Sequence, residues 1–179
     1  MGEKKLPHMR KNLLTNCKKF GKIHIERKKK GYDKMTIWFD MDGTIADLYS
    51  VENWLPMLRA YDPAPYALAK PLVHMATFAR LLHKAQANGY KVGVISWGSK
   101  CSTPAYDVAV TAAKVAWLRK HLPSVKWDEI HVVPYGTPKQ SFAHSDVDVL
   151  FDDEERNRID WTGTAYDVDN IFGVLASFR

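Results

Sequence analysis

Three aspartates lie within eight residues in the stretch TIWFDMDGTIAD, which spans Thr36 to Asp47. Asp40 and Asp42 follow an apolar run and are separated by one residue, so both side chains would lie on one face of a continued strand. Gly43 then permits a sharp turn that brings backbone N–H groups near an anion. Because acids beside a buried strand are costly unless something compensates their charge, this stretch predicts a site that uses them chemically.

Polar residues also end two later apolar runs. Ser96 ends VGVIS, and Asp152 and Asp153 end the run that contains VLF. Asp40 and Asp42, together with one or both of Asp152 and Asp153, would form a hard oxygen site suited to Mg²⁺. Ser96 and Lys139 add a hydroxyl donor and an ammonium group, which suit phosphate oxygens. Acids with a metal on one side and donors with a cation on the other indicate phosphoryl transfer.

The spacing of the first two acids also predicts their roles. Phosphomonoesters hydrolyse very slowly unaided, and a carboxylate nucleophile divides the reaction into two easier displacements through an aspartyl-phosphate. Asp40, at the end of the strand, is placed to be the nucleophile. Asp42, two residues on, is placed to protonate the leaving oxygen and then to take a proton from the attacking water.

The rest of the chain predicts the elements that position these groups. Apolar runs rich in β-branched and aromatic residues predict strands at residues 35–40, 90–96, 129–135, 146–153 and 164–168. Helical spacing predicts helices at residues 72–89, 105–121 and 168–178, and a short helix at 51–62 that Pro56 breaks before a turn at 62–65. Strands that alternate with helices predict an α/β, Rossmann-like parallel sheet flanked by helices. Ligands of such sheets bind beyond the carboxyl ends of the strands, where Asp40, Ser96 and Asp152 are expected to meet.

The four motifs together resemble those of the haloacid-dehalogenase (HAD) superfamily. The matching pieces, in order, are DMDGT at residues 40–44, Ser96, Lys139 in GTPK, and the DD pair at 152–153. The resemblance covers residues 35–179 and implies a HAD fold with a small helical cap at about residues 47–72. It implies Asp40 as nucleophile and Asp42 as general acid and base.

The resemblance also implies the ligands. Mg²⁺ would be held by Asp40, the backbone carbonyl of Asp42 and Asp152, with Asp153 in a supporting or metal-shell role. The predicted metal residues are therefore Asp40, Asp42, Asp152 and Asp153. By the resemblance, Thr44, Ser96 and Lys139 would contact the phosphoryl group or stabilise the nucleophile. The predicted phosphate contacts are these three residues together with Gly43 and Trp97.

Within the superfamily, the pattern is most similar to the 5′(3′)-deoxyribonucleotidase-like group. A nucleoside monophosphate is accordingly the leading substrate class. Aromatic residues of the cap and of the segment after Ser96 are candidates for stacking on a base: Tyr49, Trp54, Tyr61, Tyr66 and Trp97. The alternatives are a phosphatase of small metabolites or of nucleic-acid ends, and a non-catalytic module that binds phosphate.

Several single residues have competing interpretations. Lys139 is preferred for the third motif over Lys100, which lies just past Ser96, and over Lys114, which falls in the middle of a helix. Asp47 is expected to cap a helix rather than to bind metal. The charged residues at 154–158 are expected to form a solvated helical turn, with the alternative that Asn157 points back at the site.

Charge is distributed unevenly along the 179 residues. Residues 1–34 carry twelve Lys and Arg against three Asp and Glu, whereas residues 35–179 carry fourteen against seventeen. The first segment predicts a basic, disordered extension that is a candidate arm for nucleic acid, unless translation begins at Met35. No apolar run is long enough to span a membrane, and the basic start of the sequence lacks the apolar region that a secretory signal needs, so neither is expected. The two cysteines predict reduced thiols in a cytoplasmic protein.

Overall fold

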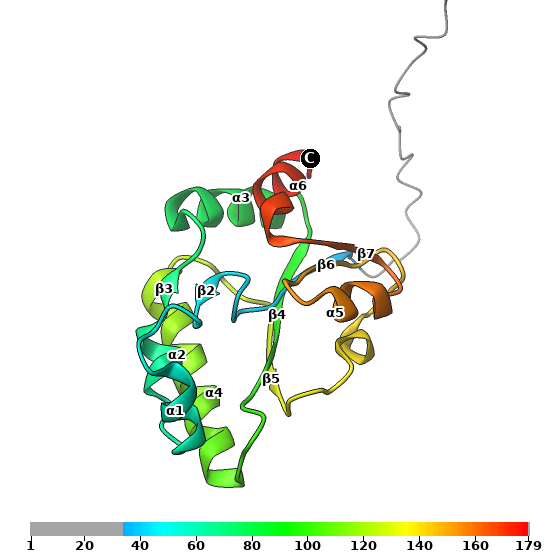
Figure 1. Ribbon diagram of the computed structural model, residues 1–179. Coiled ribbons are helices and arrows are strands. Elements are labelled where there is room, and N and C mark those ends of the chain that lie inside the picture. Colours follow the sequence, from blue (N-terminus) through cyan, green and yellow to red (C-terminus); the bar gives the residue numbers. More distant parts are fainter. Residues whose placement is uncertain (1–33, 179) are drawn as a thin grey trace, which may run out of the picture. The chain divides into compact units, whose positions relative to one another are not determined.

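The computed structural model describes residues 34–178, and the central feature of this part is a five-stranded sheet (Figure 1). The strand order is β5-β4-β1-β6-β7, and every neighbouring pair is parallel. The strands are β1 (Thr36–Phe39), β4 (Lys91–Trp97), β5 (Glu129–Val133), β6 (Val149–Phe151) and β7 (Thr164–Tyr166). The predicted Rossmann-like α/β fold is confirmed. The predicted extension at residues 1–34 lies outside the described residues, apart from Lys34.

Helices cover the sheet because each strand alternates its apolar side chains between two faces. Ile37 and Phe39 of β1 pack into a core with three helices, whereas Trp38 packs on the opposite face with Trp161 and with Phe142. The three helices of the first face are α3 (Met75–Ala87), α4 (Pro104–His121) and α6 (Ile171–Ser177). The second face carries η1 (Lys139–Phe142) and the segment that follows α5 (Glu155–Asp160). Both faces of the central strands are therefore buried.

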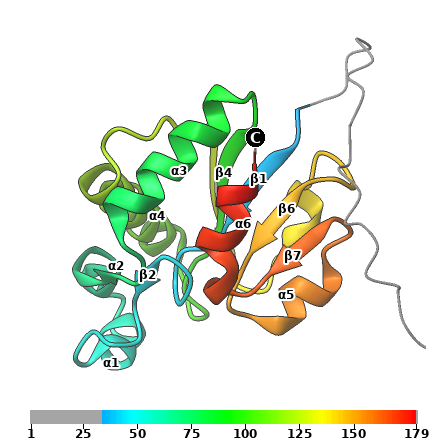
Figure 2. The ribbon, with the colours of Figure 1, turned by 90° about the horizontal axis from the view of Figure 1, so that it is seen from above.

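A small insertion follows β1 and forms the predicted helical cap. The short strands β2 (Ala46–Asp47) and β3 (Lys70–Pro71) pair antiparallel, and the insertion between them holds α1 (Trp54–Arg59) and α2 (Ala64–Leu68). Figure 2 shows both helices grouped near β2, away from β6 and β7.

The prediction that Pro56 breaks a helix in this insertion is wrong. Pro56 does not break α1 but lies in its first turn, where backbone N–H groups have no partner within the helix. The turn predicted at residues 62–65 ends in α2, whose second residue is Pro65. Burial of Tyr66 against α4 supplies the packing that such a short helix needs.

The cap is fixed to α4 by buried contacts. Leu58 and Tyr66 pack against Tyr106 of α4, and the Tyr106 hydroxyl donates to the carbonyl of Asp62 at 3.1 Å. The Trp117 indole N–H donates to the carbonyl of Ala69 at 2.7 Å, next to β3. These bonds tie both ends of α2 to the helix that follows β4, so the cap presents a preformed wall to the sheet edge.

Other boundaries also differ from the prediction, by one to three residues at most ends. The helix predicted at 72–89 begins at Met75, because the His74 ring accepts from the N–H of Thr77 and caps it. The helix predicted at 168–178 opens with a 3₁₀ turn, η2 (Val168–Asn170). β6 starts only at Val149, since the preceding Asp148 binds neighbouring donors instead of continuing the strand. Within residues 34–178, no helix combines the length and apolarity needed to cross a membrane.

Asp148 is a buried acid that ties the start of the sheet together. Its carboxylate accepts from the N–H groups of Thr36 and His144 and from the Ser145 hydroxyl, each at 2.9 Å, and from the Trp38 indole at 3.2 Å. Burial alone would raise the pKa of Asp148, but these donors outweigh it and lower the pKa below its ordinary value.

We expect Asp148→Asn to lower the free energy of unfolding at pH 7 by about 3 kcal/mol, because the amide leaves buried donors unsatisfied. A folded-state pKa below the unfolded one stabilises the protein above pH ~4, and this contribution is lost as the pH falls through the folded value. The difference in free energy of unfolding between wild type and variant, measured by urea unfolding, should therefore become smaller toward pH 3. Asp146→Asn, two residues earlier and exposed, is the control. A difference that is constant with pH would contradict the role of the ionised carboxylate.

Candidate active site

The candidate site lies where the strand order reverses. The chain leaves β1 toward β4 on one side and leaves β6 toward β7 on the other, so a crevice is expected beyond the carboxyl ends of β1 and β6. Asp40 follows β1, and its N–H donates to the carbonyl of Phe151 at 2.9 Å. The N–H of Asp152, which follows β6, donates to Tyr166 at 3.2 Å. The sheet ladder thus fixes both backbones at the crevice.

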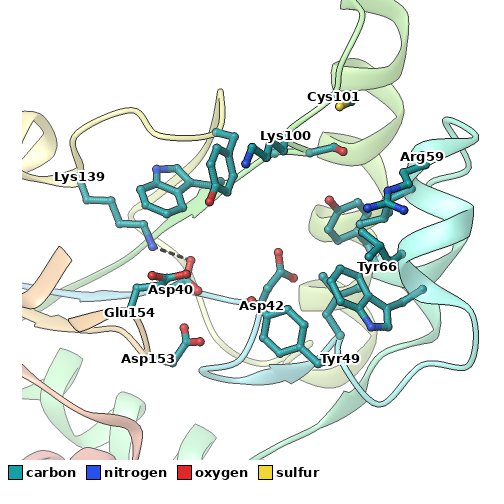
Figure 3. Close-up of a pocket in the computed structure, with 18 residues that line it drawn as sticks. Asp40, Asp42, Tyr49, Arg59, Tyr66, Lys100, Cys101, Lys139, Asp153 and Glu154 are labelled. Atoms are coloured by element: carbon teal, nitrogen blue, oxygen red, sulfur yellow. Dashed lines mark hydrogen bonds and ion pairs between the residues drawn. The ribbon is translucent and has the colours of Figure 1, made fainter. Parts of the chain in front are cut away.

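Three of the four predicted metal residues come together there. Asp40, Asp152 and Asp153 each offer an oxygen, and these oxygens lie within 4.8 Å of one another. The Lys139 ammonium lies between two of them, 2.7 Å from Asp40 Oδ1 and 2.6 Å from Asp152 Oδ2. Asp42 is outside this cluster, and its side chain points into the cavity described below (Figure 3).

The cluster carries more negative charge than Lys139 neutralises. Burial, together with the charges of Asp40 and Asp152, raises the pKa of Asp153 to about 7. Burial and the charge of Asp40 also raise the pKa of Asp152, against the opposing effect of Lys139. Three carboxylates with one ammonium favour binding of a further cation, and an all-oxygen donor set fits Mg²⁺.

The turn after β1 contacts Asp153 through Gly43 and Thr44. Gly43 has φ +81°, and a Cβ on this residue would overlap the Asp153 carboxyl group. The buried Thr44 hydroxyl donates to Asp153 Oδ1 at 3.2 Å and accepts from its N–H at 3.1 Å. The structure thus places Thr44 against the fourth motif, while its predicted contact with phosphate remains a prediction.

Asp42 is paired with Lys114, the mid-helix lysine that is not preferred for the third motif. Lys114 of α4 is wholly buried, and its ammonium forms an ion pair with Asp42 Oδ2. It also donates to the buried Ser96 hydroxyl at 2.8 Å. Burial raises the pKa of Asp42, and Lys114 opposes that rise. A signal for Lys114 was present, because it follows Val110 by four residues on the buried stripe of α4.

A cavity of about 500 Å³ extends from these acids toward the cap. Its lining includes Asp40, Asp42, Asp153 and Lys139 at one end. In Figure 3, Asp42 lies between this end and the cap side chains Tyr49, Tyr66 and Arg59. Lys100 lines the cavity as well, but it forms no ion pair with a described residue. Of these two lysines, Lys139 is the one that contacts Asp40.

Aromatic side chains form two walls of the cavity. Trp97 and Tyr135 lie 5.1 Å apart between ring centroids, and the guanidinium of Arg156 stacks 4.5 Å from the Trp97 ring. Across the cavity, Tyr49 and Trp54 of the cap lie 5.2 Å apart. Tyr66 also lines the cavity. Tyr61, the fifth aromatic candidate, packs against Tyr106 instead and is outside the lining.

The helical turn after β6 is more than a solvated surface. Asn157 is buried and donates to both oxygens of Asp152 at 3.1 Å, which is the alternative that has it pointing back at the site. Arg158 donates to the carbonyls of Asp152 and Asp153 at 2.7 Å each. Sequence reasoning missed Arg158 because nothing in its spacing distinguishes an arginine on backbone carbonyls from one in solvent. The expectation that Asp47 caps a helix is wrong: it lies in β2, and among the described residues its carboxylate accepts from the N–H of Ser50 at 3.2 Å.

Comparisons with known proteins give few matches. No protein-family model matches the chain, and no curated protein matches it. Among solved structures, it is similar to a D,D-heptose 1,7-bisphosphate phosphatase from Burkholderia thailandensis, with 16% identity over 70% of each chain and a TM-score of 0.45. The function is therefore inferred from the site itself.

Proposed function

We propose that the protein is a Mg²⁺-dependent phosphomonoester hydrolase that acts through an aspartyl-phosphate on Asp40. The observation that carries this proposal is the pairing of Asp40 with Lys139 inside a three-carboxylate cluster, at the end of a cavity that Asp42 also lines. The resemblance of the four motifs to the HAD superfamily points to the same chemistry.

In this reaction Asp40, Asp42 and Lys139 have separate roles. An oxygen of Asp40 attacks phosphorus, the bond from phosphorus to the leaving oxygen breaks, and the proton of Asp42 passes to that oxygen. Asp42, now a carboxylate, takes a proton from water, whose oxygen attacks phosphorus and releases Asp40. Lys139 fixes the orientation of the nucleophile. A Mg²⁺ held by Asp40, Asp152 and Asp153 would neutralise charge on the phosphoryl oxygens.

A nucleoside monophosphate is the substrate class that the cavity supports best. Its two aromatic walls, Trp97 with Tyr135 and Tyr49 with Trp54, suit a flat base. A sugar phosphate without a base would leave these rings without a stacking partner. By this proposal the protein is a nucleotidase of the 5′(3′)-deoxyribonucleotidase type, and the reduced state expected for its two cysteines suits the cytoplasm.

The proposal is tested by phosphate release from a substrate panel in Mg²⁺ and in EDTA. Ribose 5-phosphate and the matching nucleoside 5′-monophosphate form the decisive pair, because they differ only in the base. We expect turnover to be lost in EDTA, restored by Mg²⁺, and about 5- to 150-fold higher in kcat/KM for the nucleotide, as base stacking is worth roughly 1–3 kcal/mol.

The alternatives predict different results from the same panel. A preference for ribose 5-phosphate would indicate a small-metabolite phosphatase. A preference for 3′- or 5′-phosphorylated oligonucleotides that is salt-dependent and weakened by deleting residues 1–34 would indicate a nucleic-acid-end phosphatase. Phosphate binding without release from any substrate would indicate the non-catalytic module.

A further inference from the structure

Lys114 is a charged residue in the middle of an apolar helix face. It lies on α4 with no exposed surface, among the buried side chains Val110 and Trp117. A buried ammonium is costly unless every part of it has a partner, so its neighbours indicate what it does.

The neighbours of Lys114 come from three different elements. Asp42 lies in the turn after β1, and Ser96, whose hydroxyl is 2.8 Å from the ammonium, lies in β4. Tyr66 of α2 covers the ammonium with its ring, whose centroid is 4.6 Å away. The turn, the sheet and the cap therefore together fix the position of the ammonium.

This fixed ammonium determines the orientation of Asp42. Lys114 binds Oδ2, and no described residue forms a hydrogen bond with Oδ1. One oxygen of the carboxyl group is thus held from behind while the residue lines the cavity beside Asp40. A carboxyl group on a free turn would sample several rotamers, whereas proton transfer requires a fixed distance to the leaving oxygen.

We propose that Lys114 is a positioning residue that holds Asp42 in place for proton transfer to the leaving oxygen and from the attacking water. This inference rests on the proposed phosphatase function and assigns the two buried lysines separate tasks. Lys139 orients the nucleophile, and Lys114 orients the general acid and base. Tyr66 links the second task to the cap, because the same ring covers Lys114 and lines the cavity.

The test uses Lys114→Met with two aryl phosphates that differ mainly in the leaving group. p-Nitrophenyl phosphate has a good leaving group that needs little protonation, whereas phenyl phosphate needs the acid. We expect kcat/KM to fall about 100-fold for phenyl phosphate and less than about 10-fold for p-nitrophenyl phosphate. p-Nitrophenyl phosphate should also give a burst of p-nitrophenol, because the second step then lacks its positioned base.

Val110→Ala is the matched control, since it removes packing one turn away on the same face of α4 and leaves the ammonium in place. It should lower activity on both substrates by the same factor. An equal fall for both substrates in Lys114→Met would overturn the inference and leave only a structural role. Absence of turnover by the wild type on both aryl phosphates and on the nucleotides of the panel would instead contradict the proposed function itself.

A double-mutant cycle covers the case in which Lys114→Met folds poorly. Asp42→Asn combined with Lys114→Met removes both charges, so this protein should unfold at a higher temperature than Lys114→Met alone. If Lys114 acts through Asp42, adding Lys114→Met to Asp42→Asn should change kcat/KM for p-nitrophenyl phosphate by less than about 2-fold. A further large loss in the Asp42→Asn background would contradict a role exerted through Asp42.

Discussion

Replacing Asp40 with asparagine should reduce phosphate release by about 10⁴-fold or more, because the amide is a poor nucleophile at the position where the covalent bond forms. The substitution keeps the size of the side chain, and the backbone N–H of residue 40 still bonds to Phe151 in the sheet ladder. The fold should therefore survive the loss of activity. Phosphate release is measured with the best substrate of the panel, and far-UV circular dichroism checks the fold.

Asp47→Asn is the matched control for this substitution. It changes the third acid of the same stretch, whose carboxylate accepts from the N–H of Ser50 and from no other described residue, and which lies outside the carboxylate cluster. Its activity should stay within about 2-fold of wild type. A second readout is covalent: acid-quenched wild type should yield a phosphorylated peptide that contains Asp40, and the Asp40→Asn protein should not. Turnover by Asp40→Asn close to wild type would exclude the aspartyl-phosphate.

The residues at strand ends could be predicted because sequence and topology agree about them. Asp40 and Asp152 each follow a short apolar run, and parallel sheets bring the ends of such runs to one edge. The structure places them around Lys139, 99 residues after Asp40 in the chain. A local pattern was sufficient because the geometry of the sheet supplied the rest.

Contacts that depend on helix docking could not be predicted in the same way. Lys114 lies 72 residues from Asp42, and which groups it meets depends on how α4 packs against the sheet and the cap. A mid-helix position argues against Lys114 as the lysine of the third motif, but it does not identify the partner that a lysine on the buried stripe of a helix needs. The helix at Ala64–Leu68 was missed for a related reason, since its Pro-rich sequence favours a turn until Tyr66 packs against α4.

Lys139→Met should reduce turnover by about 10²- to 10³-fold and also destabilise the metal-free protein. The ammonium is almost fully buried between Asp40 and Asp152, and burial, which would lower its pKa, is outweighed by these charges, which raise it. Methionine fills similar space but leaves two buried carboxylates close together without their cation. Removing one partner of a buried ion pair costs about 3–5 kcal/mol.

Added Mg²⁺ should recover part of this lost stability, because a cation bound by the same carboxylates compensates their repulsion. Thermal unfolding of Lys139→Met in EDTA and in Mg²⁺ should therefore differ by more than that of the wild type. Lys100→Met is the matched control, since this lysine lines the same cavity without an ion pair to a described residue, and it should change thermal stability little. If Lys100→Met lost more activity than Lys139→Met, the third motif would have to be reassigned to Lys100. Equal unfolding temperatures for Lys139→Met in EDTA and in Mg²⁺ would argue against cation binding by Asp40 and Asp152, which Lys139 neutralises in the wild type.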